Sequence, residues 1–147
     1  SPERRETALL FGATEVAAPE EVADLVRRTA DGLGVDRVIE LSGNPAAFRN
    51  VWPTIRTGGR IILIGSVFPS EPVSLALEDV VRRCITIRGI HNYAPRDLVA
   101  ATTFLERHHR DFPFASLVAR WFPLSRTEEA FAFASETKAP RIGVRPD

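Results

Sequence analysis

The residues best placed to contact a ligand lie where two short apolar runs end in glycine. The first run spans residues 38–43 and the second spans residues 60–65. Glycine has no Cβ, so the backbone at Gly43 and Gly65 can approach a ligand closely, although glycine also favours ordinary turns. Glu40 is an acidic residue within the first run. We expect its carboxylate either to accept hydrogen bonds from backbone donors at the strand end or to take part in the site that follows.

The other reactive side chains form no recognisable catalytic or metal-binding motif. Cys84 is the single cysteine, which excludes an internal disulfide, and its apolar neighbours predict a small core residue. His108 and His109 are adjacent, so they cannot form the i, i+4 pair that binds metals on a helix, and both are expected at the surface. We assign no catalytic residue and no metal ligand. Hydroxyl groups without a neighbouring base occur at Ser42, Thr86 and Thr137.

A βαβ unit would place the two glycines at one edge of a sheet. The pattern predicts a strand at 37–42, a helix at 45–55, a breaker at 57–59 and a second strand at 60–65. Such a unit implies a parallel sheet that binds ligands at the carboxyl ends of its strands. Further helices are expected at 2–11, 20–29, 77–83 and 95–108 and in a final segment capped by Ser125, with strands at 15–17, 73–77, 85–90, 117–122 and 141–144.

The composition is that of a globular domain with balanced charge. The chain has 147 residues, of which 44% are hydrophobic and 26% are charged. Nineteen basic residues balance nineteen acidic ones, so charge gives no argument for binding nucleic acid or a membrane surface. No signal peptide is visible and the single cysteine favours a reducing cytoplasm. The absence of methionine agrees with a chain that starts inside a longer protein.

The order of the elements and several short motifs resemble the carboxyl-terminal part of the medium-chain, zinc-type alcohol dehydrogenases. The stretch from residue 80 to residue 95 resembles the subgroup linked to phosphonate catabolism. The motifs of the wider resemblance are SPERR at 1–5, FGAT at 11–14, GVD at 34–36, the run at 38–43, GGR at 58–60, TIRG at 86–89 and EAF at 129–131.

This resemblance implies an α/β fold with a partial Rossmann-like, doubly wound parallel sheet. Residues 1–91 would form a partial dinucleotide-binding domain without its first two strands, and residues 92–147 would return into the catalytic domain. No G-x-G-x-x-G motif occurs in the sequence. The resemblance places that motif, the acidic residue that holds the ribose, and the zinc ligands upstream of Ser1. We therefore expect the isolated chain to be inactive and a strand at 15–17 to lack a hydrogen-bonding neighbour.

The implied cofactor is NAD or NADP. The resemblance sets residues 41–44 beside adenine and ribose, and residues 64–66 and 90–92 beside the nicotinamide. Arg4 would face the adenosine ribose, where it could also meet a 2′-phosphate, and Arg141 would contact the pyrophosphate. His91 has a competing interpretation as a structural or solvated residue. The full set of implied cofactor-binding residues is Arg4, Leu41, Ser42, Gly43, Asn44, Ile64, Gly65, Ser66, Ile90, His91, Asn92 and Arg141.

The implied function is that of an oxidoreductase. The full-length protein would transfer a hydride between a small alcohol and the cofactor, with zinc polarising the alcohol oxygen. A zinc-free reductase of the quinone reductase type and a standalone, nonenzymatic small-molecule-binding domain are alternatives. No nucleic acid or membrane partner is expected. A homodimer or tetramer is expected to form through the sheet edge near 73–77 and 85–91.

Overall fold

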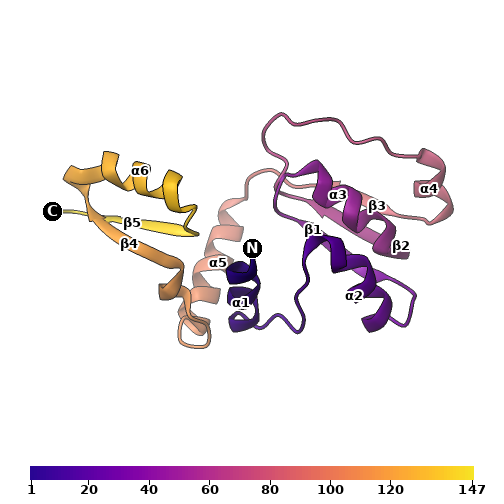
Figure 1. Ribbon diagram of the computed structural model, residues 1–147, viewed down its shortest axis with the longest axis horizontal. Coiled ribbons are helices and arrows are strands. Elements are labelled where there is room, and N and C mark those ends of the chain that lie inside the picture. Colours follow the sequence, from indigo (N-terminus) through magenta and orange to yellow (C-terminus); the bar gives the residue numbers. More distant parts are fainter. The chain divides into compact units, whose positions relative to one another are not determined.

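The computed structural model describes residues 1–147, which divide into two compact units (Figure 1). The first unit comprises Ser1–Arg5 and Thr14–Tyr93, and the second comprises Glu6–Ala13 and Ala94–Asp147. Helix α1 (Pro2–Leu10) contributes residues to both units. None of the helices is both long enough and apolar enough to span a lipid bilayer.

Three parallel strands form the sheet of the first unit, in the order β1-β2-β3. Glu40 pairs with Leu63, and Leu63 pairs with Gly89, so the last residues of the three strands lie in one row. The segments that follow the strands therefore leave the sheet at one shared edge. The strands are β1 (Val35–Glu40), β2 (Ile55–Leu63) and β3 (Thr86–Gly89).

The helices of the first unit begin where local sequence favours them. Asn44 caps helix α3 by accepting a hydrogen bond from the backbone of Ala46 (2.9 Å), and Pro45 occupies the first turn, where its missing N–H costs nothing. Helix α2 carries two basic residues, Arg27 and Arg28, in its last turn, which complements the helix dipole. These helices are α2 (Val22–Thr29), α3 (Pro45–Val51) and α4 (Leu77–Arg82).

One face of the sheet holds the core of this unit and the other face is open. Ile55, Ile61 and Ile85 are buried, and Phe48 and Val51 of α3 pack against them. Side chains alternate between the faces of a strand, so the neighbours of the core residues point away from α3. Ile39 accordingly keeps 58% of its surface exposed. Strand β1 is also an edge strand, since it pairs only with β2.

The second unit contains a two-stranded parallel sheet and two helices. Phe122 and Ala130 are buried between the sheet and the last helix. The rings of Phe11, Phe112 and Phe114 pack together, with centroids 5.3–6.0 Å apart. The elements are α5 (Pro95–His108), β4 (Val118–Pro123), α6 (Thr127–Thr137) and β5 (Arg141–Arg145).

The βαβ unit differs from the predicted boundaries. Helix α3 ends at Val51, a single 3₁₀ turn follows, and β2 already begins at Ile55. The expected breaker at 57–59 therefore lies inside a strand. Gly58 has a φ of +75°, and the register between β1 and β2 shifts between Val35 and Arg37. This irregularity lets the strand continue through two glycines.

Two predicted strands do not form. Residues 15–17 pair with no strand, as expected for a segment without a neighbour. Residues 73–76 are irregular, and α4 begins at Leu77. Val73 and Leu75 are partly buried and line a small pocket together with Phe48 of α3, so their alternation arises without pairing in a sheet. The strand expected at 73–77 is therefore absent from the predicted subunit interface.

Two further side-chain predictions are wrong. Ser125 does not cap the last helix, which begins at Thr127; its hydroxyl donates to Asp147 (2.9 Å) instead. Cys84 is exposed, with a φ of +52°. It follows Arg83 at the end of α4, where the chain reverses into β3, so the apolar residues around it in sequence do not surround it in space.

Candidate functional site

Three loops meet at the carboxyl edge of the β1-β2-β3 sheet. Residues 41–44 follow β1, residues 64–66 follow β2, and residues 90–92 follow β3. The backbone N–H of Ile64 donates to the carbonyl oxygen of Glu40 (2.9 Å), and that of Ile90 donates to Leu63 (2.9 Å). The fold therefore brings together three segments that the sequence predicted as ligand-contacting.

The first two loops touch through their glycines. Gly43 has a φ of +68°, a conformation that glycine adopts without strain. A Cβ built on Gly43 would lie 2.9 Å from the carbonyl carbon of Gly65 and nearer still to its oxygen. A Cβ on Gly65 would lie 2.5 Å from the carbonyl oxygen of Leu41. Neither position can hold a side chain unless the loops separate.

The carboxylate of Glu40 organises the first loop from within. Glu40 is only 5% exposed. Its Oε1 accepts hydrogen bonds from the backbone N–H of Ser42 (2.7 Å), the hydroxyl of Ser42 (2.5 Å) and the backbone N–H of Gly43 (3.0 Å). The expected backbone donors at the strand end are therefore present, and they offset the cost of burying the carboxylate.

The hydrogen bonds continue from the loop into helix α3. The hydroxyl oxygen of Ser42 accepts from the backbone N–H of Asn44 (3.1 Å). Asn44 in turn caps α3 through its side chain. These connected hydrogen bonds hold the loop between β1 and α3 in place.

The groups that remain available to a ligand are apolar or neutral. Leu41 is 68% exposed although it directly follows a strand. The backbone N–H groups of Ser66 and His91 make no hydrogen bond within the chain. An exposed apolar side chain suits contact with a planar ring, and unused backbone donors suit an amide, which needs hydrogen bonds and no counter-charge.

Arg4 and Arg141 do not belong to these three loops, whereas His91 and Asn92 lie in the third loop. Arg4 belongs to α1. Arg141 begins β5 in the second unit, where its guanidinium donates to the carbonyl oxygen of Pro140 (3.0 Å). His91 is exposed, and Asn92 has a φ of +59°. No group of three or more His, Cys, Asp and Glu side chains lies close enough together to hold a metal ion.

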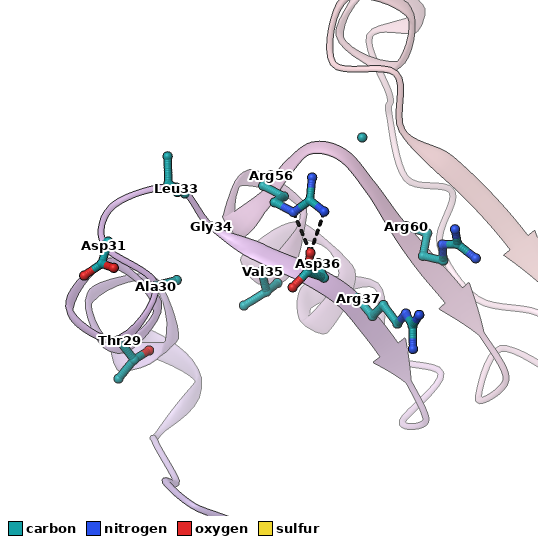
Figure 2. Close-up of a pocket in the computed structure, with 11 residues that line it drawn as sticks. Thr29, Ala30, Asp31, Leu33, Gly34, Val35, Asp36, Arg37, Arg56 and Arg60 are labelled. Atoms are coloured by element: carbon teal, nitrogen blue, oxygen red, sulfur yellow. Dashed lines mark hydrogen bonds and ion pairs between the residues drawn. The ribbon is translucent and has the colours of Figure 1, made fainter.

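A larger pocket of about 910 Å³ lies at the opposite, amino end of β1 and β2 (Figure 2). Arg56 forms an ion pair with Asp36 there (Nε–Oδ1 2.6 Å), and Arg37 stands beside Arg60 in the register of the two strands. The sequence did not reveal this pocket, since only strand register brings these arginines together. Parallel sheets bind ligands at their carboxyl ends, so the three loops are the stronger candidate site despite their smaller hollow.

Comparison with known proteins gives consistent matches along the chain. A family model described as zinc-binding dehydrogenase matches residues 1–107. L-threonine 3-dehydrogenase of Caldanaerobacter subterraneus is 28% identical over 145 residues, which cover 97% of this chain and 42% of that protein. D-arabitol-phosphate dehydrogenase of Enterococcus avium is 30% identical over 112 residues, or 76% of this chain and 31% of that protein. The chain thus spans about two fifths or less of the length of these curated relatives.

Solved structures share the fold. The crystal structure of an alcohol dehydrogenase from Thermotoga maritima matches with a TM-score of 0.91 and 22% identity, covering 100% of this chain and 41% of that one. A zinc-binding alcohol dehydrogenase domain protein from Burkholderia ambifaria matches with a TM-score of 0.82 and 26% identity, covering 100% and 40% of the two chains. These matches confirm the α/β class with a Rossmann-like parallel sheet.

Proposed function

Because this chain belongs to the zinc-binding dehydrogenase family, we propose that the whole protein transfers a hydride between an alcohol and a nicotinamide dinucleotide, NAD or NADP. The observation that carries the proposal is the meeting of three loops at the carboxyl ends of β1, β2 and β3. This edge is where doubly wound sheets bind dinucleotides. Residues 41–44, 64–66 and 90–92 form the proposed cofactor cleft.

The surface of the proposed cleft suits the ring ends of such a cofactor. Leu41 offers an exposed apolar face to a planar ring. The unused N–H groups of Ser66 and His91 can donate to a carboxamide oxygen without placing a charge beside the ring. When bound, the cofactor supplies the carbon that accepts the hydride. The role of this chain is to orient that ring.

We propose that the zinc ligands of the whole protein lie outside this chain, in which no group of three or more His, Cys, Asp and Glu side chains lies close enough together to hold a metal ion. We further assign residues 1–91 to the cofactor-binding domain and residues 92–147 to the catalytic domain, a division supported by the boundary between the compact units near Tyr93.

Two copies of the whole protein are proposed to pair through the outer edge of β3. This strand pairs with β2 on one side only, and its Ile87 is 39% exposed. An open strand edge with an apolar side chain favours pairing with a second chain. We place the protein in the cytoplasm, where the exposed thiol of Cys84 stays reduced.

The test is a turnover screen of the whole protein. NAD and NADP are each offered with simple alcohols, L-threonine, arabitol phosphate and hydroxyalkylphosphonates, and reduced cofactor is followed by absorbance. We expect turnover with at least one hydroxyl compound and a preference for one cofactor. Failure to bind either reduced cofactor, together with no turnover on any alcohol, would contradict the proposal.

A further inference from the structure

We infer that Glu40 is the positioning residue that shapes the cofactor cleft, an inference that rests on the proposed function. Glu40 does not contact the cofactor directly, because its carboxylate is buried and its oxygens accept hydrogen bonds from Ser42 and Gly43. It acts on the cofactor through the loops that it holds.

The carboxylate of Glu40 is bound by hydrogen-bond donors and by no cationic side chain. Glu40 makes no ion pair, and its charge is met by two backbone N–H groups and one hydroxyl, from Ser42 and Gly43. Hydrogen bonds to an ionised acceptor are stronger than neutral ones. A glutamine here would keep the shape but would turn an amide NH₂ or a neutral oxygen toward the same donors. The hydrogen bonds that hold the loop would weaken while the strand kept its packing.

The backbone carbonyl of Glu40 holds the second loop. Its oxygen accepts from the N–H of Ile64 (2.9 Å) and from the N–H of Gly65 (3.0 Å). The carboxylate of the same residue binds Gly43, and Gly43 lies against Gly65. One residue therefore fixes the adenosine-side loop and the nicotinamide-side loop to each other.

The consequence is a cleft organised before the cofactor arrives. A flexible loop must be ordered when the cofactor binds, and this ordering costs free energy. A loop that is already ordered in the free protein avoids this cost on binding. Loosening the Glu40 contacts should therefore weaken cofactor binding, whereas recognition of the alcohol, to which we assign no residue of these loops, should stay unchanged. This combination separates positioning of the cofactor from a general loss of structure.

The experiment compares Glu40→Gln with Thr54→Val in the whole protein. Thr54 is also a buried polar residue, at 7% exposure, and its hydroxyl donates to Val51 (2.7 Å) just before the amino end of β2, away from the cleft. Dissociation constants for NADH and NADPH are measured by fluorescence, and KM values for cofactor and alcohol by initial rates. Thermal unfolding of each variant is recorded alongside.

We expect Glu40→Gln to raise the dissociation constant of the cofactor by roughly tenfold, which corresponds to about 1.4 kcal/mol. Its KM for the alcohol should change by less than about twofold, since that difference is well under 1 kcal/mol. Thr54→Val should lower the melting temperature while leaving cofactor affinity unchanged. Ser42→Ala, which removes an exposed hydroxyl from the same network, should fold and weaken binding in the same direction by roughly threefold.

The outcomes separate the two proposals. A wild-type protein that binds neither NADH nor NADPH overturns the proposed function and the inference with it. A wild-type protein that binds cofactor, with Glu40→Gln and Ser42→Ala binding equally well, overturns only the role of Glu40. Equal loss of cofactor affinity in Thr54→Val also overturns it, because destabilisation alone would then explain the effect.

Discussion

Gly43 and Gly65 lie in direct backbone contact, although 21 residues of chain, including helix α3, separate them. Each glycine occupies the space where the Cβ of the other position would stand. The contact joins the loops after β1 and β2 at the edge of the sheet that we assign to the cofactor.

Replacing either glycine should destabilise the protein. Gly43→Ala or Gly65→Ala places a methyl group within 3 Å of backbone atoms of the other loop, and Gly43 also has a positive φ. We expect a loss of at least about 2 kcal/mol in the free energy of unfolding, measured with denaturant on the whole protein. Gly89→Ala is the matched control, since its Cβ would meet nothing within 4 Å, and it should cost less than about 0.5 kcal/mol. Equal stability of all three variants would contradict the contact.

Asp79 joins α4 to the turn before β2, and its removal should lower the stability of the protein. Its Oδ2 accepts from the indole N–H of Trp52 (2.7 Å) and from Arg83 (2.8 Å), which also donates to the carbonyl oxygen of Ile55. Asp79→Ala leaves these part-buried donors without their acceptor, so we expect a loss of about 1–2 kcal/mol. Tryptophan fluorescence during unfolding provides the measurement.

The neighbouring acidic residue supplies the control for Asp79. Glu78 pairs with Arg82 (2.8 Å), and both side chains are more than two thirds exposed. Exposed pairs of this kind contribute little, so Glu78→Ala should change stability by less than about 0.5 kcal/mol. If Glu78→Ala cost as much as Asp79→Ala, the contacts with Trp52 and Arg83 would not explain the effect.

Glu129 should make a small contribution to stability that disappears in acid. A hydrogen bond from Arg126 lowers the pKa of Glu129 from its ordinary value of 4.5. A carboxyl whose pKa is lower in the folded state stabilises that state above pH 4.5, and the contribution is lost as pH falls through the lowered value. Wild type should therefore be slightly more stable than Glu129→Gln at neutral pH and equally stable in strong acid.

Salt dependence checks the origin of this contribution. Glu129 and Arg126 are exposed to solvent, so high salt should screen their attraction and reduce the difference between wild type and Glu129→Gln at neutral pH. Chemical denaturation by urea, which adds no ions, is the suitable measurement. A difference that persisted in acid and in high salt would have a cause other than this pair.

Residues 1–147 expressed alone should not behave as a stable monomer. Strand β1 has an unpaired edge, and the exposed fractions of Ile39 and Leu41 beside it are 58% and 68%. Exposed strand edges and apolar patches favour association. We expect aggregation or strong binding of a hydrophobic dye without a cooperative transition. A soluble monomer with one sharp melting transition would contradict this prediction.

Local sequence predicted most of the helices and strands and their order along the chain. The helix at 95–108 was predicted at its observed bounds, because a proline starts it and an apolar stripe runs along it. The βαβ order placed Gly43 and Gly65 at one edge, since parallel strands must end together. The same reasoning failed at residues 73–77, where burial alternates without a strand.

The sequence by itself therefore determined the class of the fold and which segments meet at the carboxyl edge of the sheet, because periodicity, caps and turn glycines act over a few residues. Only the tertiary structure decided how that edge is held. The contact of Gly43 with Gly65 and the exposure of Cys84 depend on how strands pair and where the chain reverses. Such contacts join atoms brought together by strand register and close packing, which no local pattern of residue types encodes.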